Sequence, residues 1–216
     1  MTSQHHGLSA ATSDPPLTLD TLLSPDAQDW LATATARIAA DPDTIQVLFP
    51  AAARRCGRPT ADAVRAALLL ALPQCGDELA TTTAELYRRG DPSEQRAVLR
   101  ALPLLEDNDP SFGDLALPLV HEALRTNDTT LVEAALGSYA TRHLKVDAFR
   151  QAVLKCVFCE IPLDRISGLP ERADGELARM LADFARERTA AGQPVPSDIE
   201  PLIRAFPAPP IPEGAA

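Results

Sequence analysis

The sequence predicts an all-α protein without strands. Its 216 residues include only 10 glycines and are 4% aromatic, while the strong helix formers Ala and Leu dominate. Apolar residues recur at helical spacing, as in Val98, Leu102 and Leu105, and no segment alternates as a strand would. Short connections make neighbouring helices antiparallel, so we expect HEAT-like antiparallel helix pairs, arranged as a short solenoid or an irregular helical bundle.

Prolines mark the expected helix starts. Ser24, Asp41, Asp91 and Asp109 each precede a proline, which places a capping side chain before a residue suited to the first helical position. Together with the apolar spacing, these starts predict helices over residues 25–40, 42–56, 60–72, 77–89, 92–106, 112–126, 128–137, 147–160 and 171–191.

The two ends of the chain differ in composition from the middle. Residues 1–16 lack any apolar period, which predicts a disordered N-terminus. Residues 193–216 hold seven of the 20 prolines, which predicts a Pro-rich C-terminal tail with at most a short helix around Asp198–Ala205. A single helical domain is expected between them, over residues 17–192.

The formal net charge of −10 argues against two classes of partner. A nucleic-acid-binding protein needs a basic footprint, and so does a protein that binds an anionic membrane surface. No apolar run approaches the roughly 18 residues of a spanning helix, and no secretory signal is visible. We therefore expect a cytoplasmic protein that neither binds nucleic acid nor inserts into a membrane.

Cys156 and Cys159 form a CxxC pair, but a zinc site would need a second pair or histidines at ligand spacing. The four cysteines are therefore interpreted as reduced, buried apolar residues. The sequence also lacks the glycine-rich phosphate loops, the zinc-protease motif and the serine-hydrolase motif. No metal ion and no cofactor are expected.

The helix around the CxxC pair carries the strongest candidate site. It is apolar on most sides, which is typical of an inner helix, so Gln151 and Lys155 are expected to face protein rather than water. Phe158 lies opposite the main apolar face. A partly buried lysine needs a partner, which makes Lys155 a functional candidate. The alternative is a structural ion pair with Glu133 or Glu187, or an extended stem that reaches water.

Weaker candidates lie on either side of this helix. Asn127 belongs most simply to a turn before a helix, and Glu133 to a solvated face. Arg165 or Arg172 could form an anion site. Arg179 belongs to a run of opposite charges at helical spacing, which indicates a salt-bridged outer face.

Several motifs in the second half of the chain are similar to those of the EboA family. The most diagnostic are Gln-x-x-Leu-Lys-x-x-Phe, starting at Gln151, and Leu-Ala-Arg-Met-Leu over 177–181. The resemblance covers roughly residues 45–192. Phe149 stands where the family more often has Trp, and Ser138 where it more often has Pro, which suggests an actinobacterial-type relative.

The resemblance implies a genomic context rather than a mechanism. EboA proteins are encoded in ebo clusters beside secondary-metabolite pathways, with neighbours that resemble a prenyltransferase, a TatD-like hydrolase, a dehydroquinate-synthase-like protein and a TIM-barrel isomerase. The clusters are associated with traffic or maturation of lipophilic metabolites. The family carries no established catalytic residues.

The sequence is compatible with three functions. The first is a secondary-metabolism protein that binds a small, lipophilic metabolite and assists its processing or traffic. The second is a cofactor-free tailoring enzyme of isomerase or cyclase type, with Lys155 as base or iminium former and Glu133 steadying charge. The third is a helical scaffold for other ebo-type biosynthetic proteins. The residues expected to contact a ligand are Asn127, Tyr139, Gln151, Phe158, Arg165 and Arg179.

Overall fold

A computed structural model of the chain describes residues 19–207. Within this range the chain forms α-helices and short 3-10 helices and no strand, so the predicted all-α class is confirmed. The disorder expected for residues 1–16 lies outside the described residues, and so does the chain after Pro207. None of the helices in residues 19–207 is both long and apolar enough to cross a membrane.

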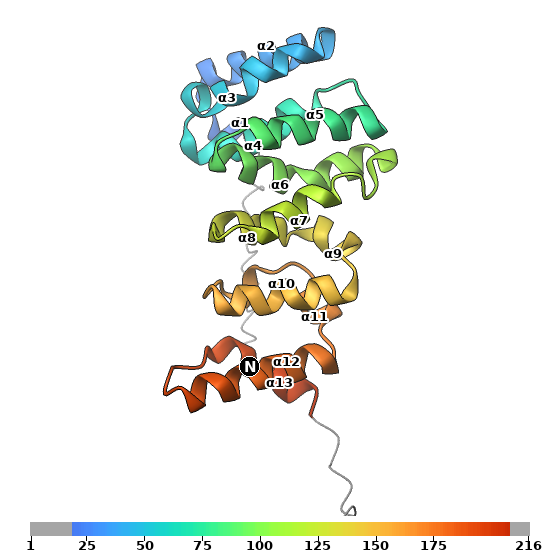
Figure 1. Cartoon of the computed structure of the whole chain (residues 1–216). Helices are drawn as coiled ribbons and strands as arrows, with labels where there is room; N and C mark the ends of the chain where they lie inside the picture. Colours follow the sequence, from blue (N-terminus) through green and yellow to red (C-terminus); the bar gives the residue numbers. More distant parts are fainter. Residues whose placement is uncertain (1–18, 208–216) are drawn as a thin grey trace, which may run out of the picture.

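The helices are stacked along one long axis, from α2 at one end to α12 and α13 at the other (Figure 1). The α-helices are α1 (Leu19–Leu22), α2 (Pro25–Ala40), α3 (Ile45–Cys56), α4 (Ala61–Leu70), α5 (Gly76–Arg89), α6 (Pro92–Asn108), α7 (Leu117–Arg125), α8 (Thr129–Ala135), α9 (Ser138–His143), α10 (Val146–Phe158), α11 (Leu169–Arg172), α12 (Gly175–Ala190) and α13 (Glu200–Ala205). The 3-10 helices are η1 (Pro42–Thr44), η2 (Arg58–Thr60), η3 (Pro110–Phe112), η4 (Leu163–Arg165) and η5 (Ser197–Ile199).

One column of helices links the two ends of the stack. Helix α4 packs on α6, α6 on α8, α8 on α10, and α10 on α12. The buried Leu, Ala, Val, Ile and Phe side chains form one continuous core along this column, from Leu23 to Ile199. This arrangement leaves the outer face of each helix in the column at the surface. The HEAT-like repeat stays a prediction.

Most of the predicted caps are present. The Ser24 side chain accepts from the N–H of Ala27 at the start of α2, and Asp91 forms a capping box with Glu94 at the start of α6. Asp109 caps η3 by accepting from the Ser111 N–H. Asp41 accepts no such bond in the described structure, and the chain there begins with η1 instead of an α-helix.

Not every proline marks a helix start. Pro50 lies inside α3 and Pro103 lies inside α6, and both helices continue through the proline. Each proline removes one backbone donor from its helix. Because Leu102 and Leu105 are buried on either side of Pro103, tertiary packing holds α6 in helical conformation despite this loss.

The largest departure from the predicted helix bounds precedes α7. The helix expected over residues 112–126 begins only at Leu117. The buried Tyr139 holds the intervening turn, because its hydroxyl donates to the Gly113 carbonyl at 2.8 Å and accepts from the Ala116 N–H at 3.1 Å. The helix that contributes Tyr139, α9, was not predicted, and it follows directly after the shorter α8.

The expected short helix after residue 197 is present as η5 and α13, and it packs on the stack. Ile199 is completely buried, and the Asp198 carboxylate accepts from the Leu163 N–H at 3.0 Å. Residues 197–205 therefore cover α12 instead of trailing from it (Figure 1). The proposed division of the chain after residue 192 stays a prediction.

Candidate functional site

Four of the predicted site residues come together around a surface groove, which we call the α10 groove. It has a volume of about 410 Å³ and is open to solvent. Of these four, Asn127 lies in the turn between α7 and α8, and Gln151, Lys155 and Phe158 lie on α10. The lining consists of Asn127, Gln151, Leu154, Lys155, Phe158, Cys159 and Phe184.

Phe158 is the most unusual member of the groove. It is the last residue of α10, and its side chain is 72% exposed. The opposite face of the same helix is buried, which agrees with the placement that helical spacing predicted for Phe158. A single exposed apolar residue is ordinary, but Leu154 and Phe184 adjoin Phe158 and extend the apolar surface.

The apolar surface continues along α12 beyond the α10 groove. Phe158 and Phe184 also border a second hollow of about 290 Å³, which Glu187 and Arg188 line on the other side. The Arg188 guanidinium lies 5.8 Å from the centre of the Phe184 ring, in a cation–π contact. The aromatic surface is therefore bordered by charge on its α12 side.

Lys155 is held by the backbone of the preceding layer. Its Nζ donates to the carbonyls of Leu124 and Thr126, both at 2.6 Å, and so satisfies the C-terminal end of α7. Neither carboxylate considered for it from the sequence, Glu133 or Glu187, forms an ion pair with it among residues 19–207. An ammonium group has three N–H donors, so one remains beyond these two bonds.

Gln151 corrects the expectation that α10 is an inner helix. Its side chain is exposed, as is that of Phe158. The reason is the single column of helices, which buries one side of α10 against α8 and α12 and leaves the other side at the surface. The side-chain amides of Gln151 and Asn127 make no hydrogen bond to another group in residues 19–207, so both are open to a ligand.

Two of the remaining candidates, Glu133 and Arg165, pair with each other outside the groove. The Arg165 Nη1 lies 3.7 Å from the Glu133 Oε1, and the arginine side chain is 60% exposed. Neither residue lines the α10 groove. The structure therefore does not bring Glu133 to Lys155 within this groove, although the enzyme hypothesis assigned them a joint role.

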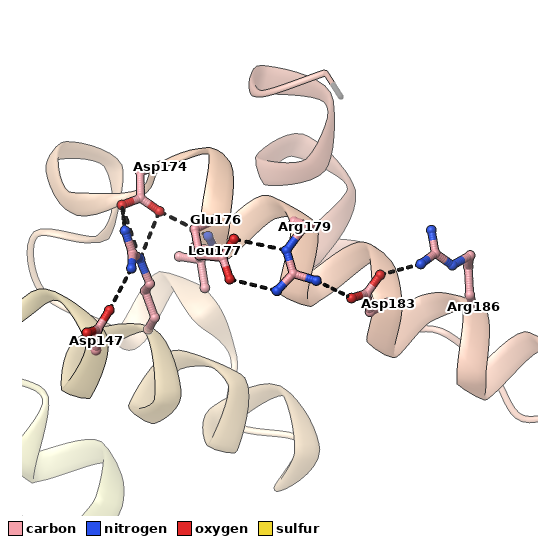
Figure 2. Close-up of polar contacts among 8 residues, drawn as sticks. Asp147, Asp174, Glu176, Leu177, Arg179, Asp183 and Arg186 are labelled. Atoms are coloured by element: carbon pink, nitrogen blue, oxygen red, sulfur yellow. Dashed lines mark hydrogen bonds and ion pairs between the residues drawn. The ribbon is translucent and has the colours of Figure 1, made fainter. Parts of the chain in front are cut away.

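Arg179 lies on the outer face of α12 within a chain of ion pairs (Figure 2). Its guanidinium donates to both Glu176 oxygens, at 2.6 and 2.9 Å, and to Asp183 at 2.7 Å. Asp183 also accepts from Arg186. The hydrogen bonds of Glu176, together with its charge, raise the pKa of Arg179. The charges at helical spacing thus form a salt-bridged face, as predicted, and Arg179 does not line the α10 groove.

Tyr139, another predicted ligand contact, does not line the groove either. Its side chain is buried in the core.

Another ionic contact, between Arg150 and Asp174, joins α10 to the start of α12. Asp174 caps α12 by accepting from the Leu177 N–H at 3.0 Å, and it also accepts from the Arg150 guanidinium (Figure 2). The hydrogen bond from Arg150 is the main cause that lowers the pKa of Asp174. Asp147 accepts from the same arginine at 2.7 Å. This contact fixes the spacing of the two helices that flank the groove.

Cys156 and Cys159 are free thiols, and neither belongs to a metal-binding group among residues 19–207. Burial raises the pKa of Cys156 to about 12, and Cys159 lies half-buried at the edge of the groove. The interpretation of the cysteines as buried is wrong for Cys75, which is exposed, and holds fully only for Cys156, because Cys56 is half-buried like Cys159. Among the described residues, no group of three or more His, Cys, Asp or Glu side chains is placed to hold a metal ion.

Sequence reasoning missed Phe184 as a groove residue. Its spacing with Leu177 and Leu181 assigned it to the apolar face of its helix, and both of those neighbours are buried. Phe184 itself is only half-buried, because it lies at the edge of that face and is directed toward α10. No signal in the sequence places Phe184 beside Phe158, because only the packing of α12 against α10 brings the two rings to one groove.

Comparison with known proteins identifies a family. The family model described as "Metabolite traffic protein EboA" matches residues 57–204, which include the α10 groove. Neither a curated protein nor a solved structure matches the chain. The family match covers more than half of the 216 residues and agrees with the motifs noted in the sequence. The chain therefore belongs to the EboA family of metabolite traffic proteins.

Proposed function

We propose that the protein carries a small, lipophilic metabolite in the α10 groove. The observation that carries this proposal is the 72% exposure of Phe158 beside Leu154 and Phe184. Covering such a surface with an apolar ligand is favourable, because each Å² of apolar area removed from water stabilises the complex by about 25 cal/mol. The volume of about 410 Å³ is in the range of small-molecule sites.

The polar end of the groove suits a ligand with an oxygen acceptor. The amides of Asn127 and Gln151 and the remaining N–H of Lys155 can donate to a carbonyl, hydroxyl or carboxylate oxygen. The apolar body of the same ligand would lie on Phe158 and Phe184. We therefore propose an amphipathic metabolite, whose polar group fixes its orientation.

The open shape of the groove supports transport over conversion. A catalyst gains from excluding water from the reacting group, whereas a carrier must release its ligand. An iminium mechanism would also need a lysine amine free to react, and Lys155 instead donates two hydrogen bonds to backbone carbonyls. Borohydride trapping with the metabolite bound tests the enzyme alternative, since an adduct at Lys155 would favour it.

The family resemblance supports a proposal on the origin of the metabolite and on the cellular setting of the protein. We infer that the metabolite comes from secondary metabolism, and that the protein acts in the cytoplasm beside other ebo-type biosynthetic proteins. The net charge of −10 supports an aqueous role. Recovery of such proteins with the tagged chain, with and without residues 208–216, tests whether the end of the chain contributes to their binding, because this deletion keeps the packed residues 197–205.

Binding of the apolar dye Nile red tests the groove directly. Phe158→Ser removes the exposed ring, and we expect at least an about tenfold higher Kd for the dye in a fluorescence titration. Val47→Ser is the matched control, because Val47 is 74% exposed on α3, away from the groove lining. The proposal fails if both variants bind the dye as the wild type does.

Metabolite recovery tests the natural ligand. The full chain and its Phe158→Ser and Val47→Ser variants are purified from the same cells, and the bound small molecules are extracted and identified by mass spectrometry. We expect an amphipathic compound with the wild type and with Val47→Ser, and a depleted amount with Phe158→Ser. Equal recovery from all three proteins would contradict binding in the α10 groove.

A further inference from the structure

A second cavity lies near the opposite end of the stack and has a different chemistry. It has a volume of about 650 Å³ and is formed by α3, η2, α4 and the start of α6. Four arginines line it, and we call it the arginine cavity. Its charged lining residues are Arg54, Arg58, Arg65, Asp91, Glu94 and Arg96. We propose that this cavity binds the phosphoryl group of a small molecule.

Arg65 gives the cavity a fixed cationic wall. Its side chain is only 2% exposed, and it donates to the Phe49 carbonyl, to Ser93 and to Glu94. The guanidinium also lies 5.5 Å from the centre of the Phe49 ring. These contacts hold the side chain in place, and Glu94 balances its charge at 3.3 Å.

Arg96 is likewise held in place. Its guanidinium donates to both oxygens of Asp62, at 2.9 and 3.0 Å, in a bidentate pair. The charge of Arg96 is therefore already balanced outside the cavity lining. Arg65 and Arg96 shape the cavity, but they do not supply its uncompensated charge.

Arg54 and Arg58 supply that uncompensated charge. Both side chains are exposed, and neither makes a hydrogen bond or an ion pair with any residue from 19 to 207. Arg54 lies in the last turn of α3 and Arg58 in η2, so both cations border one cavity. Each offers a planar fork of N–H donors, which matches the oxygens of a phosphate.

The carboxylates of the lining do not cancel these two charges. Glu94 is paired with Arg65. Asp91 accepts from the Glu94 N–H at 2.9 Å as the cap of α6, so its charge is directed at the helix end. With Asp62, which pairs with Arg96, three carboxylates face the four arginines of the lining, and none of the three pairs with Arg54 or Arg58. This local excess of positive charge stands out in a chain of net charge −10.

The size of the cavity favours a phosphorylated molecule over a bare ion. A volume of about 650 Å³ is in the range of sites for whole small molecules. The exposed arginines are placed to bind the phosphoryl group, while the rest of the cavity holds the organic part. This site is separate from the α10 groove, and the inference does not rest on the function proposed for that groove.

Inorganic pyrophosphate is the probe for this site. Its binding to the full chain is measured by isothermal titration calorimetry, with ³¹P NMR as a second readout. We expect Arg54→Ala and Arg58→Ala each to raise the Kd by at least about tenfold, because each removes charge-assisted hydrogen bonds. Arg55→Ala is the matched control: Arg55 is exposed on the same helix and does not line the cavity.

The outcomes separate this site from general charge attraction. The inference is supported if only the two cavity variants lose affinity while all three keep the circular dichroism melting curve of the wild type. It is overturned if the wild type does not bind pyrophosphate, or if Arg55→Ala loses as much affinity as the others. A parallel citrate titration that is tighter than pyrophosphate and shows the same variant pattern would overturn the phosphoryl assignment in favour of a carboxylate ligand.

Discussion

Lys155 illustrates how a single side chain can join two layers of the stack. Its ammonium group donates to two backbone carbonyls at the C-terminal end of α7, and its side chain lines the α10 groove. The sequence could identify Lys155 as a lysine in need of a partner. It could not identify the partner, because backbone carbonyls 29 and 31 residues away carry no signature in the sequence.

Replacement of this lysine should destabilise the fold. Lys155→Ala leaves the carbonyls of Leu124 and Thr126 without their donor, and we expect the free energy of unfolding to fall by about 1 to 3 kcal/mol in urea titrations. Lys145→Ala is the control, because Lys145 is exposed and makes no side-chain bond in residues 19–207. Equal stability of the two variants would contradict the capping role.

Asp62 should make stability depend on pH. Burial raises the pKa of Asp62, but the hydrogen bonds and charges of Arg96 and Arg100 outweigh burial and lower it below the usual 3.8. A carboxyl whose pKa is lower in the folded state stabilises the fold above the unfolded-state pKa and loses this contribution as the pH falls through the folded-state value. The contribution of Asp62 should therefore be complete near neutral pH.

Asp62→Asn tests this linkage. We expect it to lower the free energy of unfolding by about 1 to 2 kcal/mol at pH 7, and the gap to the wild type should narrow as the pH falls below 3.8. Asp29→Asn, at an exposed position with no ion pair in residues 19–207, should change little at any pH. A gap for Asp62→Asn that stays constant with pH would be inconsistent with the lowered pKa.

At the scale of elements, apolar periodicity and capping residues predict a helix well where both signals lie in the same short segment. The bounds of α2 are the same as predicted, because Ser24 and Pro25 define its start. The turn before α7 could not be predicted, because Tyr139 holds it from 23 and 26 residues further along the chain. For the same reason only part of the α10 groove could be predicted: spacing places four of its residues on one helix, but packing brings in Phe184.

One glycine controls the path between η4 and α11. Gly168 has a φ of 66°, and a Cβ at this position would lie 2.2 Å from the Thr141 Cγ2. Thr141 itself donates to the Ser167 carbonyl at 2.6 Å, which fixes α9 beside this turn. The turn therefore needs glycine both for its backbone conformation and for its close approach to α9.

Gly168→Ala should consequently lower the free energy of unfolding by about 2 to 4 kcal/mol. Gly175→Ala is the matched control, because a Cβ there meets nothing within 4 Å and α12 has already begun. We expect that control to raise stability by about 0.4 to 1 kcal/mol. Thermal and urea unfolding of both variants check these values, and a stable Gly168→Ala protein would show that the turn can rearrange.

At the scale of the whole molecule, the stack separates the arginine cavity from the α10 groove. The cavity is built from α3, α4 and α6, and the groove from α10 and α12 with the turn before α8 (Figure 1). The two linings share no residue. Substitutions at sites without shared partners usually have additive effects.

The two sites should therefore bind their probes independently. We expect Arg54→Ala to leave the Kd for Nile red within about twofold of the wild type, and Phe158→Ser to leave that for pyrophosphate equally unchanged. Both titrations on both variants, and on the double variant, check this expectation. A larger cross effect would mean that the layers between the two sites transmit a change in structure.

The position of the one tryptophan has a spectroscopic consequence. Trp30 lies in α2, at the end of the stack away from α10, and it lines neither the groove nor the arginine cavity. We therefore expect its fluorescence emission to stay unchanged when a ligand occupies the groove without altering the rest of the stack. A shift of that emission on ligand addition would be a direct optical signal that the two ends of the molecule communicate.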